Sequence, residues 1–429
     1  MIYIKETSIK FIKEPLLSPF GFKGGYINEL WQVLARISDG ENTAVGVGVQ
    51  SILWSDAEVF AEHTPDDGNM LMFSISEYAL KLLTGKSFKN PIEAMDSIKQ
   101  ETLLFAKKIT GRENLRETFV LNALVSIDNA LWSLYAKSLK KQSLPELFPR
   151  EFAPAFGYKH KKLCNIPLIT YGLKENAIRE LIEGGHFLLK IKIGSDPAGD
   201  KDPQKMLEWD KQRLSEIHEI AKDYKTEYTE NGKLAYYLDA NGRYDSLERL
   251  EDFLKHAENI GALESIVLLE EPFPENAEIS VKDLPVRVAA DESCHSLRDV
   301  EERLSLGFSA IALKPIAKTI SESLKILLAA HEKNVPCFLA DLTVPPIMVE
   351  INKSFAARVA PIPGIKIGAV ESNGAQNYLH WNKLLSYHPL FGKDFVSPKN
   401  AIFELDEEFF NTFGGAFIDS SFYLNAFNS

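Results

Sequence analysis

A regular alternation of short apolar runs and helical segments constrains the fold of this chain more than any other feature. Eight apolar or β-branched runs occur at residues 165–172, 186–194, 234–241, 265–272, 286–293, 309–315, 335–343 and 364–370. Between them, apolar residues recur with the spacing of an amphipathic helix, and the segments 246–261 and 296–307 begin with Ser and end with Gly. Strands that alternate with helices predict a parallel sheet of βαβ units. Eight such strands favour a closed barrel, and an open, doubly wound sheet is the alternative.

The two ends of the chain do not follow this alternation. Three consecutive strands are expected near residues 9–20, 28–40 and 41–52, with Asp-Gly at one turn, and a long apolar helix is expected over 118–140. Strands followed by helices indicate a separate α+β unit. We therefore expect an N-terminal α+β capping domain over residues 1–140 and a barrel over 160–374. We expect the last segment, 375–429, to pack back on the cap.

Composition excludes several classes of protein. Apolar residues make up 45% of the 429 residues and charged residues 25%, as in soluble globular proteins. A net charge of −12 argues against a nucleic-acid-binding surface, which needs a basic stripe. The first 15 residues lack the apolar core of a signal peptide, and no run of about 18 apolar residues predicts a membrane span. The three cysteines are far apart and suit a reducing compartment, so we expect a cytoplasmic protein without nucleic-acid or membrane partners.

Charged side chains follow most of the predicted barrel strands at the point where each strand ends. They are Lys190, Lys192, Asp239, Glu270, Glu271, Asp291, Glu292, Lys314 and Asp341, together with the amide of Asn241. From Asp239 onward, the strand-end charges at 239, 270, 291 and 314 are 31, 21 and 23 residues apart, about one βα unit each. Catalytic groups of such barrels lie at the carboxyl ends of the strands. The pattern therefore predicts an active site at the barrel mouth.

Three carboxylates at one barrel mouth need a counter-ion. At a separation of about 4 Å and an effective dielectric constant of about 20, each pair of like charges costs roughly 4 kcal/mol. A divalent cation removes this repulsion, and oxygen-only ligands favour Mg²⁺. Asp239, Glu270 and Asp291 are the predicted ligands. Zinc is disfavoured because no His or Cys stands at these strand ends.

The lysines are predicted to face the same cavity. Side chains of a strand alternate between its two faces, so Lys190 and Lys192 share one face while Leu189 and Ile191 face the outer helices. Lys314 ends a strand four positions further round the barrel, nearly opposite. Burial and a neighbouring cation both lower the pKa of a lysine, which allows a neutral amine to act as a base. Two opposed amines could then reach both faces of a carbon next to a carboxylate.

These motifs together resemble the enolase superfamily and, within it, the muconate-lactonizing-enzyme subgroup of the mandelate racemase/muconate lactonizing enzyme family. FLLKIKIG at 187–194 resembles the Lys-x-Lys strand of that subgroup. LDAN, LLEEP and AADES, at 238–241, 268–272 and 289–293, resemble its three metal-ligand strands, and IALKP at 311–315 resembles the strand of its second catalytic lysine. The resemblance implies a modified TIM barrel, (β/α)₇β, with an α+β capping domain. It also implies a small-molecule carboxylate substrate and a homo-oligomer.

The resemblance also implies roles for single residues. Asp239, Glu270 and Asp291 correspond to the Mg²⁺ ligands, and Lys192 and Lys314 to the acid/base groups on the two faces of the substrate, with bound Mg²⁺ stabilising an enediolate. Lys190 would assist by holding substrate charge. Glu271 is the competing choice for the second ligand, because it is adjacent to Glu270. Residues expected to support the site or contact substrate are Asn241, Glu271, Glu292, Asp341, Glu371 and Lys23, the last in a Gly-rich loop at 19–25.

Departures from related patterns limit the predicted reaction. The sixth and seventh strands end in Lys314 and Asp341 rather than in a His–Asp dyad, which disfavours the mandelate-racemase branch. The Asp-x-Asp of dipeptide epimerases is absent near the eighth strand, where Glu371 is the only carboxylate. We expect a racemase or epimerase of an amino-acid derivative or related acid. Alternatives are a syn β-elimination, as in dehydratases or o-succinylbenzoate synthase, a cycloisomerase, and a metal-stabilised ligand-binding barrel without turnover.

Overall fold

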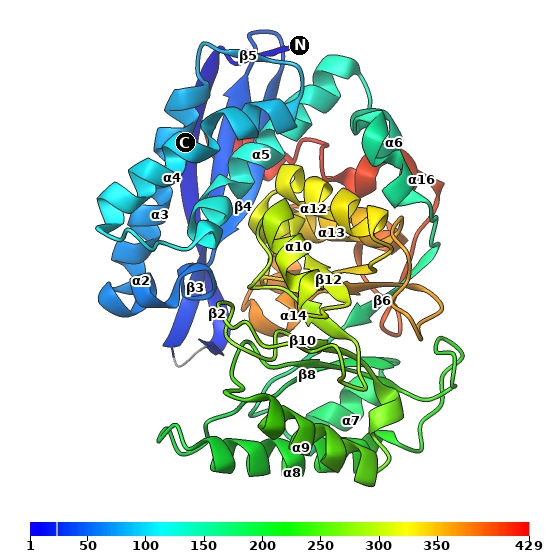
Figure 1. Cartoon of the computed structure of the whole chain (residues 1–429). Coiled ribbons are helices and arrows are strands. Elements are labelled where there is room, and N and C mark those ends of the chain that lie inside the picture. The colour runs from blue at the N-terminus through cyan, green and yellow to red at the C-terminus, as the bar shows by residue number, and fades with distance from the viewer. Residues whose placement is uncertain (23–24, 429) are drawn as a thin grey trace.

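A curled sheet of ten strands forms the larger part of the computed structural model, which describes residues 1–22 and 25–428 (Figure 1). Its strands are β6 (Lys162–Ile166), β7 (Leu168–Ile169), β8 (Leu188–Lys192), β9 (Ala235–Asp239), β10 (Ile266–Glu270), β11 (Val288–Ala290), β12 (Ala310–Leu313), β13 (Cys337–Leu339), β14 (Gly368–Glu371) and β15 (Ile402–Glu404). β6 pairs with β14 and β7 pairs with β8, and only Pro167 separates β6 from β7. One interrupted strand therefore closes the sheet. The predicted barrel is confirmed, and the open sheet is not formed.

Parallel pairing brings the charged strand ends to one level. Lys192 is in register with Asp239, and Asp239 is in register with Glu270. Because all strands from β6 to β14 run parallel, their carboxyl ends meet at one mouth.

Helices cover the outside of the barrel. They are α7 (Glu175–Glu183), α8 (Pro203–Ala221), α9 (Leu247–Asn259), α10 (Leu297–Ser305), α12 (Ile320–Glu332) and α13 (Pro346–Ala356), and a short turn, α11 (Pro315–Lys318), precedes α12. The serines that open α9 and α10 act as N-caps: the Ser246 side chain accepts from the Arg249 N–H, and Ser296 forms a capping box with Asp299. The connection from β10 to β11, residues 271–287, contains no helix.

The N-terminal unit is an antiparallel sheet covered by helices, at the upper left of Figure 1. It contains β1 (Ile2–Tyr3), β2 (Glu6–Phe22), β3 (Gly25–Ser38), β4 (Thr43–Gln50), α1 (Ile52–Ser55), α2 (Ala57–Glu62), α3 (Pro65–Leu83), β5 (Ser87–Phe88), α4 (Pro91–Thr110) and α5 (Glu117–Leu139). β4 packs so closely on α5 that a Cβ on Gly46 would lie 2.1 Å from the Ser126 carbonyl oxygen. Glycine is required there because any side chain would separate the two elements.

Helix α5 has the length and apolar character of a membrane-spanning helix. In this structure 94% of the most apolar stretch of the helix is buried, because α5 lies between the cap sheet and the barrel helices. Its apolar composition is therefore explained by a position in the core of the described protein.

The last segment of the chain contacts both units. Between the cap and the barrel lie α6 (Leu144–Leu147) and a 3₁₀ helix, η1 (Arg150–Phe156); after the barrel follow α14 (Gly374–Asn377), α15 (Trp381–Ser386), η3 (Asp394–Val396), α16 (Glu407–Thr412), η4 (Phe413–Gly415) and α17 (Ser421–Asn425). β15 pairs antiparallel with β6 of the barrel. The Tyr423 hydroxyl donates to Gln32 Oε1 of the cap sheet at 3.1 Å.

A cluster of charged or titratable side chains is buried between α13 and this segment. Glu350 and Lys353 lie on α13 with Nζ and Oε1 2.7 Å apart, and His388 Nε2 lies 3.5 Å from the same oxygen. Lys353 also donates to the Phe395 carbonyl oxygen, and its ammonium lies 4.4 Å from the centre of the Phe403 ring. We call Glu350, Lys353 and His388 the C-terminal charge cluster.

Candidate active site

A cavity lies between the barrel mouth and the cap. Its polar wall comes from strand ends and the loops after them: Lys190, Lys192, Asp239, Asn241, Glu292, Lys314, Asp341, Thr343, Glu371 and Asn373. Its apolar wall comes chiefly from the cap: Leu16, Phe20, Ile27, Leu30, Leu53 and Trp54. The cap therefore encloses the charged mouth of the barrel with an apolar roof.

The two lysines of β8 both point into the barrel, as the alternation of the strand predicts. Lys190 is buried, and its Nζ lies 3.0 Å from Asp239 Oδ2, 3.1 Å from Glu270 Oε2 and 3.0 Å from Glu371 Oε2. Lys192 lies nearer the opening, with Nζ 2.6 Å from Asp239 Oδ2 and a second bond to Asn241 Oδ1. Lys190 is thus enclosed by carboxylates, whereas Lys192 lies where a substrate can reach it.

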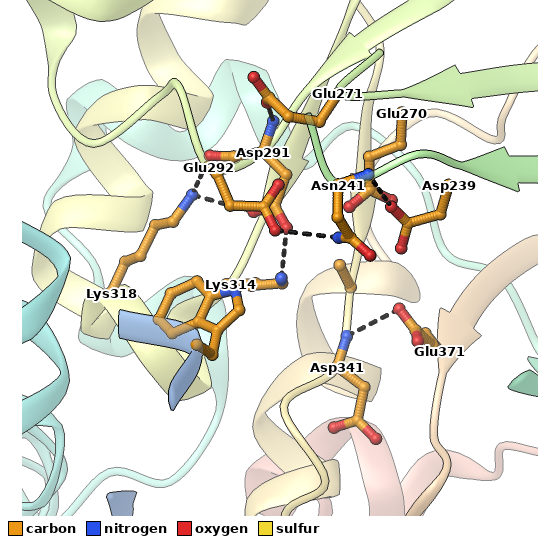
Figure 2. Close-up of polar contacts among 12 residues, drawn as sticks. Asp239, Asn241, Glu270, Glu271, Asp291, Glu292, Lys314, Lys318, Asp341 and Glu371 are labelled. Carbon is orange, nitrogen blue, oxygen red and sulfur yellow. Dashed lines mark hydrogen bonds and ion pairs between the residues drawn. The ribbon is translucent and has the colours of Figure 1, made fainter. Parts of the chain in front are cut away.

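The opposite side of the mouth is built by the segment after β12. Lys314 donates to Asp291 Oδ2, and its ammonium lies 4.8 Å from the centre of the Trp54 ring. Lys318, which the sequence analysis did not select, donates to the Asp291 carbonyl, to Asp291 Oδ1 at 3.0 Å and to the Cys294 carbonyl at 3.0 Å. Two lysines one helical turn apart therefore hold the same carboxylate (Figure 2). The four-residue spacing of Lys314 and Lys318 is the sequence signal that could have identified Lys318.

Burial and ion pairing divide the carboxylates into two groups. Burial raises the pKa of Glu270 and of Glu271 to about 8. Burial alone would also raise the pKa of Asp239, but Lys190 and Lys192 outweigh it and lower the value to about 2. The neighbouring lysines likewise hold the pKa of Asp291 well below its usual range.

The lysines depart from the expected direction. Burial lowers the pKa of Lys190 and Lys314, as expected, but the surrounding carboxylates outweigh it and raise both values above that of a free lysine. Asp239 is the strongest such neighbour of Lys190, and Asp291 of Lys314. Both amines are therefore protonated in this arrangement.

The carboxylates fit a divalent cation. Glu270, Asp291 and Glu292 each offer an oxygen within 4.8 Å of the others. Glu270 Oε1 and Glu292 Oε2 are buried without a hydrogen-bond partner. A buried acceptor without a partner costs free energy, and a hard cation with oxygen ligands removes that cost. The residues present therefore fit a metal ion.

This compact group differs in one member from the predicted ligand set. Asp239 lies on the strand next to Glu270, with Oδ2 bonded to both lysines of β8, and Glu292 takes its place among the three closest carboxylates. Glu271, the competing choice, instead accepts at Oε2 from Asp291 N, Ser293 N and Ser293 Oγ. Figure 2 shows Glu271 and Glu270 on opposite sides of the chain.

Three other predicted residues connect the site. Asn241 donates to Glu292 Oε1 at 3.0 Å and accepts from Lys192, so it links a lysine to the acidic group. Glu371 Oε2 accepts from Lys190 and from the Asp341 N–H. Asp341 Oδ2 accepts from the Asn373 N–H at 2.8 Å, and in Figure 2 its carboxylate points away from the acidic group. Lys23 lies outside the described residues.

Sequence comparison identifies the family to which these features point. The family model described as enolase C-terminal domain-like matches residues 173–388, half of the chain. The chain belongs to this family, and thus to the enolase superfamily. A comparison with curated protein sequences finds no match.

Solved structures of this superfamily share the fold. A mandelate racemase/muconate lactonizing protein from Herpetosiphon aurantiacus has a TM-score of 0.66 at 18% identity, with 94% of this chain and 96% of that chain covered. A dipeptide epimerase from Cytophaga hutchinsonii, solved with Mg and the dipeptide D-Ala-L-Val, has a TM-score of 0.65 at 18% identity, with 94% of each chain covered. An N-succinyl Arg/Lys racemase from Bacillus cereus has a TM-score of 0.65 at 15% identity, with 96% and 95% covered.

Proposed function

We propose that this enolase-superfamily protein is a Mg²⁺-dependent racemase or epimerase that removes the proton α to a carboxylate. The observation that carries the proposal is the pair of lysines, Lys192 and Lys314, on strands on opposite sides of one barrel mouth that line the same cavity. Carboxylates that fit a cation lie in the same mouth. The racemase and epimerases among the similar structures support the same reaction class.

The metal has a defined place in this proposal. Glu270 and Asp291 would hold it, together with Asp239 or Glu292. A bound Mg²⁺ would stabilise the negative charge that develops on the substrate carboxylate as the α-proton leaves. Lys192 and Lys314 would then share Asp239 and Asp291 with the bound ion, so these carboxylates would hold the two amines less strongly.

The lysines would carry the proton transfers. The neutral amine of one lysine takes the proton from one face of the α-carbon, and the C–H electron pair moves toward the carboxylate. The ammonium of the other lysine then returns a proton to the opposite face, which inverts the configuration. Lys190 keeps its proton because three carboxylates surround it, so it serves as a fixed positive charge beside the substrate carboxylate.

The apolar roof supports a substrate with an apolar group beside the reacting carbon. Leu16, Phe20, Ile27 and Leu30 of the cap cover the cavity and exclude water, which strengthens charge interactions at the mouth. The proposal includes a cytoplasmic location and a homo-oligomer. The three cysteines support the first, because all are buried and unpaired.

A syn β-elimination is the second candidate. Lys314 is held by Asp291 and stacked on Trp54, which suits a cation that does not exchange its proton. Lys192 alone would then remove the α-proton and protonate the leaving group on the same face. A cycloisomerase would use the same α-carbanion chemistry.

Proton NMR in D₂O with Mg²⁺ tests these alternatives. Pools of N-acyl amino acids, dipeptides and sugar acids are screened for loss of the α-proton signal, with Lys192→Ala and Lys314→Ala beside the wild type. Mg²⁺-dependent exchange with inversion supports a racemase or epimerase, whereas new vinyl signals support elimination. Mg²⁺ binding without exchange in any pool would favour a ligand-binding barrel without turnover.

A further inference from the structure

A residue with a strained backbone conformation follows Lys314 and Lys318 in the chain. Thr319 joins α11 to α12 with φ 72° and ψ 152°. This conformation is essentially restricted to glycine, and a β-branched residue adopts it only when the surrounding structure holds it there. Thr319 follows Lys318 directly, so the strain lies within the segment that carries Lys314 and Lys318.

A carboxylate of the cap holds the other side of this strained residue. Asp128 of α5 is fully buried, and its Oδ2 accepts from the Ser321 N–H at 2.9 Å while Oδ1 accepts from the Ser321 hydroxyl at 2.6 Å. Trp132 of the same helix donates to the Ser321 hydroxyl at 3.1 Å. A carboxylate at the N-terminus of α12 also interacts favourably with the helix dipole. The cap therefore fixes the chain two residues after Thr319.

The first residues of the segment contact Asp291, one of the three carboxylates that fit a cation. Lys314 and Lys318 both bond to the Asp291 carboxylate, and the Lys318 N–H donates to the Lys314 carbonyl at 2.7 Å. The segment is thus held at one end by Asp128 and at the other by Asp291. A shift at Ser321 would relax Thr319 and turn α11, which would move the Lys314 ammonium.

We propose that Asp128 is a positioning residue that holds Thr319 in its strained conformation and so keeps Lys314 at its place in the active site. This inference rests on the proposed proton transfer by Lys314 and extends it to a residue outside the cavity. Asp128 acts through Ser321 and does not line the cavity. The cap then sets the geometry of one acid/base group but not of Lys192, which lies on β8 across the barrel.

Four variants separate positioning from a general structural role. Asp128→Ala removes both bonds to Ser321, and Asp128→Asn removes the charge at nearly constant shape. Thr319→Gly removes the strain and the side-chain cap, whereas Thr319→Ala removes the cap, which accepts from the Glu322 N–H, and keeps the strain. The difference between the two Thr319 variants therefore reports the strain alone.

The first readout compares the two enantiomers of a substrate. In Asp128→Ala, exchange from the enantiomer deprotonated by Lys314 should fall about 100-fold, as expected when a reacting group moves by about 1 Å. Exchange of the α-proton from the enantiomer that Lys192 deprotonates should fall much less. Thr319→Gly combined with Asp128→Ala should restore most of the lost rate, whereas Thr319→Ala should not. Equal loss for both enantiomers, or no difference between the two combinations, would overturn the proposal.

The second readout needs no substrate. Amide hydrogen exchange of residues 314–322, followed by mass spectrometry, should be faster by about tenfold or more in Asp128→Ala and Asp128→Asn. Adding Thr319→Gly should return it toward the wild-type rate. Unchanged amide hydrogen exchange would refute the positioning role. This test does not require the protein to have catalytic activity. If the segment responds as expected but no acid shows α-proton exchange, the proposed reaction fails and the role of Asp128 stands.

Discussion

Two of the places where the protein buries charged side chains differ in a way that shows what makes such a group an active site. At the barrel mouth, lysines and carboxylates come from strand ends around the ring and line a cavity. In the C-terminal charge cluster, Glu350 and Lys353 come from one helix, and the Lys353 ammonium lies over the rings of Phe395, Phe403 and Phe409. None of its members lines the cavity.

Burial of charge alone therefore does not indicate chemistry. Both clusters contain a buried lysine with a displaced pKa, but in opposite directions: burial lowers the pKa of Lys353, whereas carboxylates raise that of Lys314. The functional cluster is distinguished by its cavity and by its excess of carboxylates over lysines. We expect changes at the mouth to affect catalysis and changes in the C-terminal charge cluster to affect stability.

Loss of either lysine that we propose as an acid/base group should have the largest effect. Lys192→Ala or Lys314→Ala should lower kcat/KM by about 10³-fold, within the range of a general acid or base. The melting temperature should fall little, because Asp239 keeps Lys190 and Asp291 keeps Lys318 as a cationic partner. Steady-state kinetics and thermal unfolding measure the two effects. A lysine variant with unchanged kcat/KM and a much lower melting temperature would contradict the distinction between the two clusters.

Breaking the C-terminal charge cluster should cost stability instead. Lys353→Met leaves Glu350 buried without a cation and should lower the free energy of unfolding by about 3–5 kcal/mol, measured by denaturant titration. The matched pair Lys353→Met with Glu350→Gln should recover much of this loss. The kcat of the folded fraction should stay at the wild-type value, and a large fall in kcat would show that the cluster acts on the site.

Removal of the metal should separate the carboxylates that hold the ion from those that only pair with lysines. Mg²⁺ at about 100 times its Kd should stabilise the wild type by about 2.7 kcal/mol, and EDTA should reverse this. Glu270→Gln should lose the stabilisation, because it removes a carboxylate of the compact group. Glu371→Gln, which changes a partner of Lys190 outside that group, is the control and should retain it. Calorimetric titration and thermal unfolding check both, and equal stabilisation of all three proteins would place the ion elsewhere.

The pH dependence of the free energy of unfolding should reveal Asp128, the buried carboxyl group between the cap and the barrel. Burial raises the pKa of Asp128 from 3.8 to about 7. The unfolded chain loses this proton first, so the stability that Asp128 contributes is complete below its unfolded pKa and is lost as the pH rises toward 7. The free energy of unfolding should fall by up to about 1.4 kcal/mol per pH unit in this window. Asp128→Asn should have a flatter profile in urea titrations at pH 5, 6 and 7, and an identical slope would contradict the assignment.

The barrel and most of its charged mouth could be predicted from the sequence. Strand alternation set the direction of Lys190 and Lys192, and the length of one βα unit placed Asp239, Glu270 and Asp291 on neighbouring strands. These are local rules of backbone geometry, so they do not require knowledge of the packed structure.

The remaining features depend on packing between distant segments. Asp128 lies in an apolar helix, and only docking of that helix on α12 brings it to Ser321. Trp54 belongs to the cap, and no local pattern relates it to Lys314. The direction of the lysine pKa shifts also depended on the number of carboxylates around each amine, which the tertiary structure sets.

The segment that follows the barrel has a consequence for the order in which contacts form during synthesis. Tyr423 bonds to Gln32, and β15 pairs with β6, so a segment made after both units joins the cap sheet to the barrel. A ribosome releases the N-terminal strands long before residue 423 emerges. The contacts of this segment with the cap sheet and with β6 therefore form only after the strands of both units have been made.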